Sequence, residues 1–318
     1  MNKLSKIIIS SLCFLTSYMM MPAENIVSKD FYPAENIKTI SIELSYENLE
    51  IKTTNGSDIL VEIASNNSKK IPEIFLEANN FIIKSRKNQK WNTGNICTVY
   101  VYLPNDFFPK TTNIKVSSGE IYIDNLETDE LKVSSASGDI KIIFSNVTNE
   151  IELSAASGKI EFNTGKTRKF SATTSSGDIF VQQLISKEIW CKVASGEVDT
   201  ENIECEYLSV QTSSGDIDCS KTTCQYFDIK AVSGSVDLEL DNQIEAESSI
   251  KTTSGSVDLS VPEDMNFEII ANSSSGKFED EIKERTYRPK HEYVSQYNNG
   301  GVTILIDTTS GSIELDSN

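Results

Sequence analysis

The chain has 318 residues with 47 acidic and 29 basic side chains, which gives a net charge of −18 at pH 7. This charge argues against binding to nucleic acid or to an anionic membrane surface, because basic patches supply the affinity for both. A strongly acidic surface also keeps copies of a protein apart in solution, so solubility alone is enough to explain it.

The first residues have the features of a secretory signal peptide. Lys3 and Lys6 precede an apolar run over residues 7–21, which is shorter than a membrane-spanning helix needs. We expect residues 1–23 to be removed on export and residues 24–35 to form a linker. Since no later stretch of the sequence is long and apolar enough to span a bilayer, we predict an exported protein of the periplasm, the cell surface or the extracellular space.

Residues 36–112 alternate apolar and polar side chains, but without a strict repeat. The stretch "IKTISIELSYENLEIKTTNGSDILVEI" has the period of a strand and includes "NGSDI", a blurred copy of a phrase that recurs later. A further strand ends in a proline turn at "YLPNDF". We expect this region to be a β cap, because the end repeats of a solenoid are atypical and cover its open edges.

Residues 113–318 repeat one short phrase, which reads "SSGDI" at 175–179 and again at 213–217. Its glycine recurs every 19–21 residues, with one longer step of 35 residues before the last copy, and such a period is typical of a repeat architecture. Apolar residues alternate on both sides of the glycine, as they do in strands. The glycines of the phrase are Gly119, Gly138, Gly158, Gly177, Gly196, Gly215, Gly234, Gly255, Gly276 and Gly311.

We therefore predict an all-β fold, a single-chain parallel β-solenoid (β-helix) with about ten coils of 19–21 residues. Each coil would contain a strand, a Ser-Gly corner, a second strand and a polar turn. Stacking the coils about 4.8 Å apart buries a continuous core. Glycine at the corner permits a positive φ and a close approach of the next coil. Ten equivalent serines cannot all be catalytic, so the phrase builds the scaffold.

Acidic side chains recur three residues after the glycine, at Asp199, Asp218, Asp237 and Asp258. Such a ladder of like charges can recruit Ca²⁺, although the calcium-binding nonapeptide of β-helical repeats is absent from the sequence. The single histidine, His291, has no cysteine or histidine partner nearby in the sequence. We predict no catalytic residue, no cofactor and no metal site, with Ca²⁺ as the one ion that the ladder can attract.

Two cysteines occupy equivalent positions in the repeat. Cys205 and Cys224 each lie ten residues before a corner glycine and 19 residues apart. They should face each other on adjacent coils, where a disulfide is possible if the side chains converge. An exported protein permits such a bond, and because five cysteines follow the leader, an odd thiol would be left over however they pair.

The step of 35 residues contains an insertion at residues 280–301, "DEIKERTYRPKHEYVSQYNNGG", which is basic and rich in aromatic residues. Tyr and Arg are enriched in interface hot spots, and insertions into solenoid repeats often map to the binding face. The candidate partner-binding residues are Arg285, Tyr287, Arg288 and Tyr293. The alternative is a C-terminal cap whose basic residues are answered by nearby acids such as Asp280.

Four segments follow one another in a distinctive order. They are "VYVYLPNDFFPKTTNIKVSSGEIYI", the serial "SSGDI" coils, "SGSVDLSVPEDMNFEIIANSSSGKFE" and "GGVTILIDTTSGSIEL". In this order, over roughly residues 36–316, they resemble the bacterial putative-adhesin domain family of unknown function. The resemblance implies a β-solenoid on an extracytoplasmic protein and supplies no catalytic residues.

These observations leave three kinds of function open. The first is a non-enzymatic, adhesin-like surface or periplasmic protein that binds or supports a protein or glycan of the cell envelope or of a host. The second is a polysaccharide-acting β-helix enzyme, a lyase or hydrolase, which needs two carboxylates set across a cleft. Because the acids are spread evenly and the coils lack long loops, we favour the first. The third, an envelope-stress accessory protein, has no specific support in the sequence.

Overall fold

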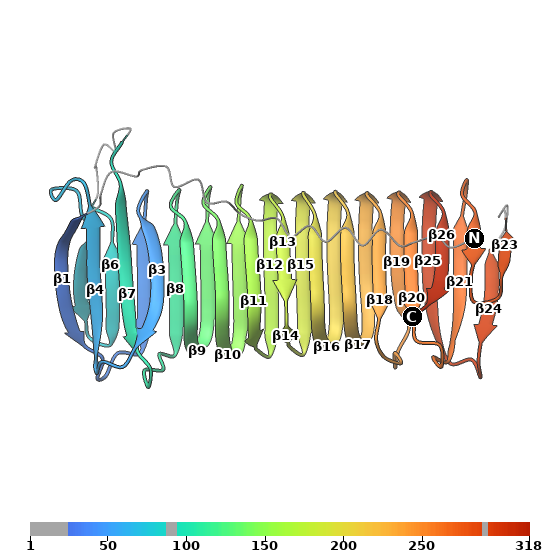
Figure 1. The fold of residues 1–318 in the computed structure, drawn as a ribbon, viewed down its shortest axis with the longest axis horizontal. Helices are drawn as coiled ribbons and strands as arrows, with labels where there is room; N and C mark the ends of the chain where they lie inside the picture. The colour runs from blue at the N-terminus through green and yellow to red at the C-terminus, as the bar shows by residue number, and fades with distance from the viewer. Residues whose placement is uncertain (1–24, 87–93, 288–291) are drawn as a thin grey trace, which may run out of the picture.

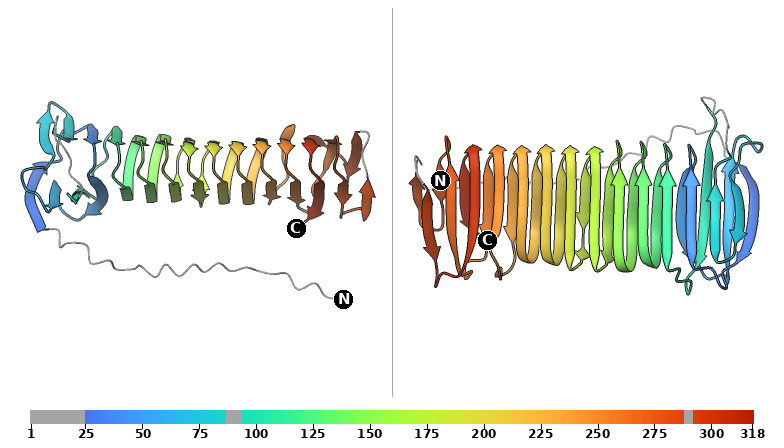
Figure 2. Two further views of the ribbon diagram at one scale, coloured as in Figure 1. Left: turned by 90° about the horizontal axis from the view of Figure 1, so that it is seen from above. Right: turned by 180° about the vertical axis from the view of Figure 1, so that it is seen from behind.

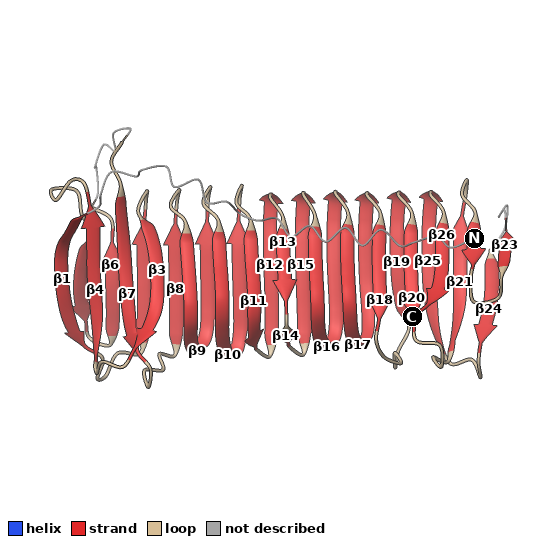
Figure 3. Cartoon of the chain, viewed as in Figure 1, coloured by secondary structure: helices blue, strands red, loops and turns tan. Residues whose placement is uncertain are grey.

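The structure is a computed structural model that describes residues 25–86, 94–287 and 292–318, and the expected signal peptide over residues 1–23 lies outside these ranges. Within them the chain is all β, with 26 strands (Figure 3). The strands stack into one elongated body (Figure 1), and a view from above shows two rows of them facing each other (Figure 2). No helix of the described residues is long and apolar enough to cross a membrane.

The strands fall into three groups along the body. The N-terminal strands are β1 (Asn25–Pro33), β2 (Thr39–Leu44), β3 (Asn48–Thr54), β4 (Asp58–Ser65), β5 (Glu73–Glu77), β6 (Asn80–Lys84), β7 (Cys97–Pro104) and β8 (Thr111–Val116). The middle strands are β9 (Ile121–Ser135), β10 (Ile140–Ala155), β11 (Ile160–Lys166), β12 (Lys169–Ser176), β13 (Ile179–Gln182), β14 (Leu184–Ile185), β15 (Glu188–Ser195), β16 (Val198–Ser214), β17 (Ile217–Ser233), β18 (Val236–Leu240), β19 (Ser248–Ser254) and β20 (Val257–Val261). The C-terminal strands are β21 (Phe267–Ser273), β22 (Phe278–Asp280), β23 (Arg285–Tyr287), β24 (Tyr293–Tyr297), β25 (Val302–Ser310) and β26 (Ile313–Ser317).

The middle of the molecule has the predicted parallel stacking of coils. β16 pairs with β17 in parallel, with Val198 opposite Ile217 near one end and Ser214 opposite Ser233 at the other. Buried and outward side chains alternate along both strands, so the buried rows of successive coils form one core. We name the outward side chains of the segment just after each Ser-Gly corner the post-corner face. Those of the segment that leads into the next corner form the pre-corner face. A long strand such as β16 runs from one corner to the next and contributes to both faces.

Glycine is needed at the corners mainly because successive coils approach each other closely there. A Cβ atom on Gly215 would lie 2.0 Å from the carbonyl oxygen of Gly196, well inside van der Waals contact. All ten predicted corner glycines stack on a neighbouring corner in this way. Only Gly196, Gly215 and Gly234 among the ten also have a positive φ. The positive φ that we expected is therefore not the general reason for glycine at the corners.

At the N-terminal end the coils do not stack in chain order. β2 and β3 lie beside β8 and β9, while their other edges pair with β6 and β7. Antiparallel pairing of β7 with β4 and of β4 with β1 then closes the end. The linker expected over residues 24–35 is wrong, because residues 25–33 form β1. Pairing with β4 and an edge-on contact between the rings of Tyr32 and Phe81, at 5.3 Å, hold this strand in place.

The C-terminal end has a similar arrangement. The last strands in the sequence, β25 and β26, lie between β19 and β20 on one side and β21 and β22 on the other. Residues 280–301 are therefore not an insertion within the last coil of the stack. They supply β23 and β24, which pair antiparallel with β22 and β21 and cover edges that would otherwise stay open (Figure 1).

Candidate functional site

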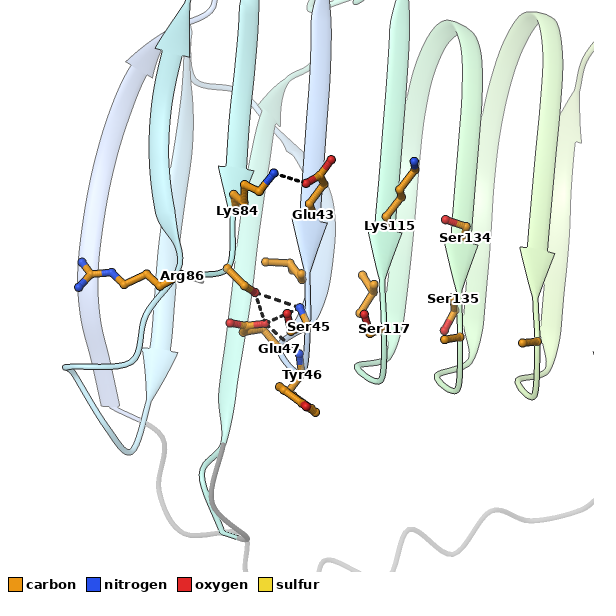
Figure 4. A pocket seen from close by; sticks show the side chains of 15 residues that line it. Glu43, Ser45, Tyr46, Glu47, Lys84, Arg86, Lys115, Ser117, Ser134 and Ser135 are labelled. Carbon is orange, nitrogen blue, oxygen red and sulfur yellow. Dashed lines mark hydrogen bonds and ion pairs between the residues drawn. The ribbon is translucent and has the colours of Figure 1, made fainter. Parts of the chain in front are cut away.

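An open groove of about 790 Å³ lies on the pre-corner face, where the N-terminal cap meets the first coils (Figure 4). We name it the N-terminal groove. β6, β2 and β8 run side by side across it, and the corner of β9 adds the next coil. The side chains labelled in Figure 4 are Glu43, Ser45, Tyr46, Glu47, Lys84, Arg86, Lys115, Ser117, Ser134 and Ser135.

Most charged side chains of the groove have a partner. Glu43 lies opposite Lys84 on one neighbouring strand and opposite Lys115 on the other. Lys84 donates a hydrogen bond to the Glu43 carboxylate, and this bond together with the two positive charges lowers the pKa of Glu43. Arg86 Nε lies 3.4 Å from the carboxylate of Glu73 on β5. Glu43 therefore stays ionised at neutral pH and is unsuited to act as a general acid.

The second carboxylate of the groove has a structural role. The Glu47 side chain is buried and accepts hydrogen bonds from the backbone N–H groups of Ser45 and Tyr46, at 2.9 and 3.0 Å, and from Ser85 Oγ at 2.6 Å. Its backbone oxygen is the one on which the corner of Gly119 stacks. Glu47 thus fixes the first corner of the solenoid, where three donors hold its Oε2 atom.

Hydroxyl groups make up much of the remaining lining. Ser117 is exposed and Ser134 is half-buried on the next coil, while the Tyr46 side chain is 50% exposed at the rim. Hydroxyls both donate and accept hydrogen bonds, and an aromatic ring adds apolar contact area. The N-terminal groove is therefore suited to hold a polar ligand with many hydrogen-bonding groups.

Sequence reasoning did not find this groove. Lys84 and Glu43 are brought together by the pairing of β6 with β2, two segments that lie outside the regular repeat. The only local signal is the alternating stretch "NFIIK", which ends in Lys84 and predicts a strand without saying what it pairs with.

The predicted partner-binding loop is largely an end cap. Tyr293 and Tyr297 donate hydrogen bonds to the buried carboxylate of Asp280, at 2.9 and 2.6 Å. The Tyr293 ring also stacks on Phe278, with 4.3 Å between the ring centres, and touches the ring of Tyr287. The Asp280 carboxylate therefore accepts hydrogen bonds from two tyrosine side chains and from the backbone N–H of Lys283, and it forms no ion pair with a basic side chain of the described loop residues.

Two predicted members of this loop remain. Arg285 is exposed and donates a hydrogen bond of 3.3 Å to the hydroxyl of Tyr287. Arg288 lies outside the described residues, as does His291. The structure brings Arg285, Tyr287 and Tyr293 together at the end of the stack, but the two tyrosines are partly buried there.

The predicted row of aspartates is present on the post-corner face. Asp199, Asp218, Asp237 and Asp258 lie opposite one another in successive strands. Partial burial and the neighbouring carboxylates raise the pKa of Asp199 to about 6 and that of Asp237 to about 6. Among the described residues, no group of three or more acidic, histidine or cysteine side chains is arranged to hold a metal ion.

The chain was compared with known protein families. The sequence model of Toastrack DUF4097 matches residues 37–149 and again residues 143–316. The chain belongs to the Toastrack DUF4097 family. No curated protein matches it.

Three solved structures are similar to this Toastrack DUF4097 protein. A "putative lipid binding protein" from Parabacteroides distasonis is 11% identical, with a TM-score of 0.46, over 90% of this chain and 96% of its own. A "putative adhesin" from Bacteroides fragilis is 10% identical, with a TM-score of 0.38, over 93% and 99%. A "putative cell adhesion protein" from Clostridium sporogenes is 11% identical, with a TM-score of 0.24, over 92% and 98%. Likenesses this distant carry no conclusion about a ligand.

The cysteines of this Toastrack DUF4097 chain lie as the repeat predicts. Cys205 on β16 is opposite Cys224 on β17, and both are buried free thiols in the structure. Burial raises the pKa of Cys224 to about 12 and raises that of Cys205 as well, which disfavours the reactive thiolate. The disulfide is not formed in this structure, and its formation on export stays a prediction.

Proposed function

We propose that this Toastrack DUF4097 protein is an exported, non-enzymatic binding protein of the adhesin type, and that the N-terminal groove is its contact site. The observation that carries the proposal is one open groove that gathers paired charges, hydroxyls and an exposed ring on a rigid stack of strands. A site built on strands holds its side chains in fixed positions, which lowers the entropy lost on binding. The signal peptide expected over residues 1–23 supports export.

Cleavage of a polysaccharide fits the groove poorly. A glycoside hydrolase needs one carboxyl group that is protonated near neutral pH and a second one across the sugar chain. Glu43 is held ionised by Lys84, and Glu47 is enclosed by its hydrogen-bond donors. The carboxyl groups with raised pKa values, Asp199 and Asp237, form an even row on the other face.

Binding assays on the chain without residues 1–23 test this proposal. The protein is presented to an array of glycans and envelope proteins beside a Lys84→Ala/Lys115→Ala variant. Lys251→Ala is the matched control, because Lys251 is an exposed lysine on the pre-corner face of β19, far along the stack from the groove. We expect a partner that binds the unchanged protein and the control alike and binds the groove variant about tenfold more weakly, which is about 1.4 kcal/mol.

Two outcomes would contradict the proposal. The first is a partner that binds the groove variant as tightly as the unchanged protein but no longer binds an Arg285→Ala/Arg288→Ala variant. This result would place the contact site in the C-terminal loop. A polysaccharide that becomes shorter during the assay would show an enzyme, and the row of aspartates on the post-corner face would then be the place to look for its acid.

A further inference from the structure

The pre-corner face carries a ladder of aromatic rings on three adjacent coils, away from the N-terminal groove. Trp190 on β15, Tyr207 on β16 and Tyr226 on β17 contact one another, with ring centres 5.0 Å and 4.7 Å apart. Trp190 and Tyr226 are each 38% exposed, although they are among the largest apolar side chains of the protein. Rings on the outside of a sheet add nothing to the core, so their exposure points to a contact with something else.

A row of side chains, most of them short, runs across successive coils from the groove to this ladder, and we name it the strip. A second hollow, of about 420 Å³, begins beside the groove and is lined partly by Ser134 and Ser154. Ser154 lies opposite Thr173, which lies opposite Lys192 on the strand of Trp190. From Lys115 to Lys192 the row crosses four coil steps, which is about 19 Å at about 4.8 Å per step.

Charges along the strip cancel locally, in contrast to the charge of −18 on the whole chain. The Lys132 ammonium lies 3.0 Å from the Glu152 carboxylate, and the Lys169 ammonium lies 3.1 Å from the Glu150 carboxylate. Beside the ladder, Lys230 pairs with Asp228. Where its charges are paired, such a surface attracts neither a polycation nor a polyanion strongly, although Lys115 and Lys192 at the two ends of the row form no ion pair with another described residue. It is complementary to a ligand that is itself uncharged.

We propose that the N-terminal groove, the strip and the aromatic ladder form one track for a neutral, linear polysaccharide. A sugar ring has an apolar face of C–H groups, which suits Trp190 and Tyr226, and an edge of hydroxyls, which suits the serines and the paired charges. A polysaccharide is long enough to reach from Lys115 to Trp190, whereas a short oligosaccharide is not. This inference rests on the proposed binding function and names its ligand class.

Affinity measured against ligand length tests the track. Neutral linear gluco-, manno-, xylo- and galacto-oligosaccharides of increasing length are titrated by calorimetry into the chain without residues 1–23. In one series we expect affinity to rise steeply once the oligosaccharide spans the strip. Trp190→Ala and Tyr226→Ala should remove that gain, about tenfold or more, and leave the binding of short members unchanged. Trp190→Phe keeps a ring and should retain most of the gain.

Two controls test whether these effects come from the aromatic ladder. Phe31 on β1 is 62% exposed and lines neither the groove nor the second hollow, so Phe31→Ala should bind every ligand as the unchanged protein does. The chain has two tryptophans, so a Trp91→Phe background leaves Trp190 as the sole tryptophan. Its fluorescence should change with long oligosaccharides and not with short ones. Because Trp190, Tyr226 and Phe31 are exposed, thermal melts should show that the variants at these three positions are folded.

The possible failures are distinguishable. Binding of short oligosaccharides in the groove, with no gain from length and no effect of Trp190→Ala, would overturn the track and leave the proposed function standing. Preference for an acidic series such as oligogalacturonate would overturn the neutral class. No binding to any neutral series, with a protein captured by the groove instead, would overturn the glycan proposal and still support a binding protein.

Discussion

Two rows of charged side chains, one on each face of the solenoid, have the same spacing but opposite signs of interaction. On the post-corner face Asp199, Asp218 and Asp237 have like-charged neighbours, and the pKa of each is raised. On the pre-corner face Lys132 lies opposite Glu152, an attractive pair. Equal backbone geometry thus supports both patterns, because the repeat fixes which residues meet and not whether they attract. A neutral partner can cover the Lys132 and Glu152 pair without leaving either charge uncompensated.

The corner that joins the two faces should give the largest effect. Gly215→Ala would place a methyl carbon 2.0 Å from the backbone oxygen of Gly196, so the coils must separate and both faces lose their pairing. We expect a loss of about 3 kcal/mol or more in the free energy of unfolding, measured by urea denaturation. Gly56→Ala is the matched control, since its Cβ would meet Thr54 Cγ2 at 3.7 Å and the backbone oxygen of Asp58 at 3.9 Å, both ordinary van der Waals contacts. Equal urea midpoints for the two variants would contradict the close-approach argument.

A buried carboxylate shows how a charge is tolerated when it is compensated. Asp280 accepts hydrogen bonds from Tyr293 and Tyr297, so Asp280→Ala leaves two phenolic hydroxyls without their acceptor at the C-terminal end. We expect a loss of about 2 kcal/mol, seen as a lower melting temperature and faster hydrogen exchange in β21 and β24. Asp280→Asn keeps an acceptor oxygen and should lose less. Unchanged exchange in the alanine variant would show that the cap does not depend on this carboxylate.

The row of aspartates should make stability depend on pH in an unusual direction. The pKa of Asp237 is about 6 in the folded protein, above its ordinary value of 3.8. Between those two values the folded state binds more protons, so this group adds stability as the pH falls from about 7 to about 4. Asp237→Asn should raise the melting temperature by a few degrees at pH 7.5 and change it little at pH 4. A lower melting temperature at pH 7.5 would mean that the ionised row is stabilising.

Much of the arrangement of side chains on the two faces could be predicted from the sequence, because a fixed repeat period determines which residues lie opposite one another on adjacent coils. The positions of Asp199 and Asp218, and of Cys205 and Cys224, follow from equal distances to their corner glycines, and the register confirms both pairs. The parallel stacking of the middle coils follows from the same period.

The two ends could not be predicted, because their strands pair out of chain order. Lys84 meets Glu43 only because the chain returns past β2, and no repeat encodes that return. Asp280 occupies an inward position that is apolar in most coils, and its tyrosine partners come from a strand that pairs antiparallel with β21. The N-terminal groove was missed for this reason, whereas a C-terminal cap was one of the two alternatives for residues 280–301, without its strand pairing.

The smallest expected effect tests the pre-corner face directly. Glu152→Gln removes the partner of Lys132, and both side chains are about half exposed, so we expect a loss of at most about 0.5 kcal/mol. The direction of the change in melting temperature is what distinguishes the two rows. Glu152→Gln should lower the melting temperature slightly at pH 7.5, whereas Asp237→Asn should raise it. Salt should shrink both differences by screening them. If both substitutions shift the melting temperature in the same direction at low salt, the charge interactions in the two rows do not have opposite signs. The inference that the strip binds a neutral ligand would then lose its support.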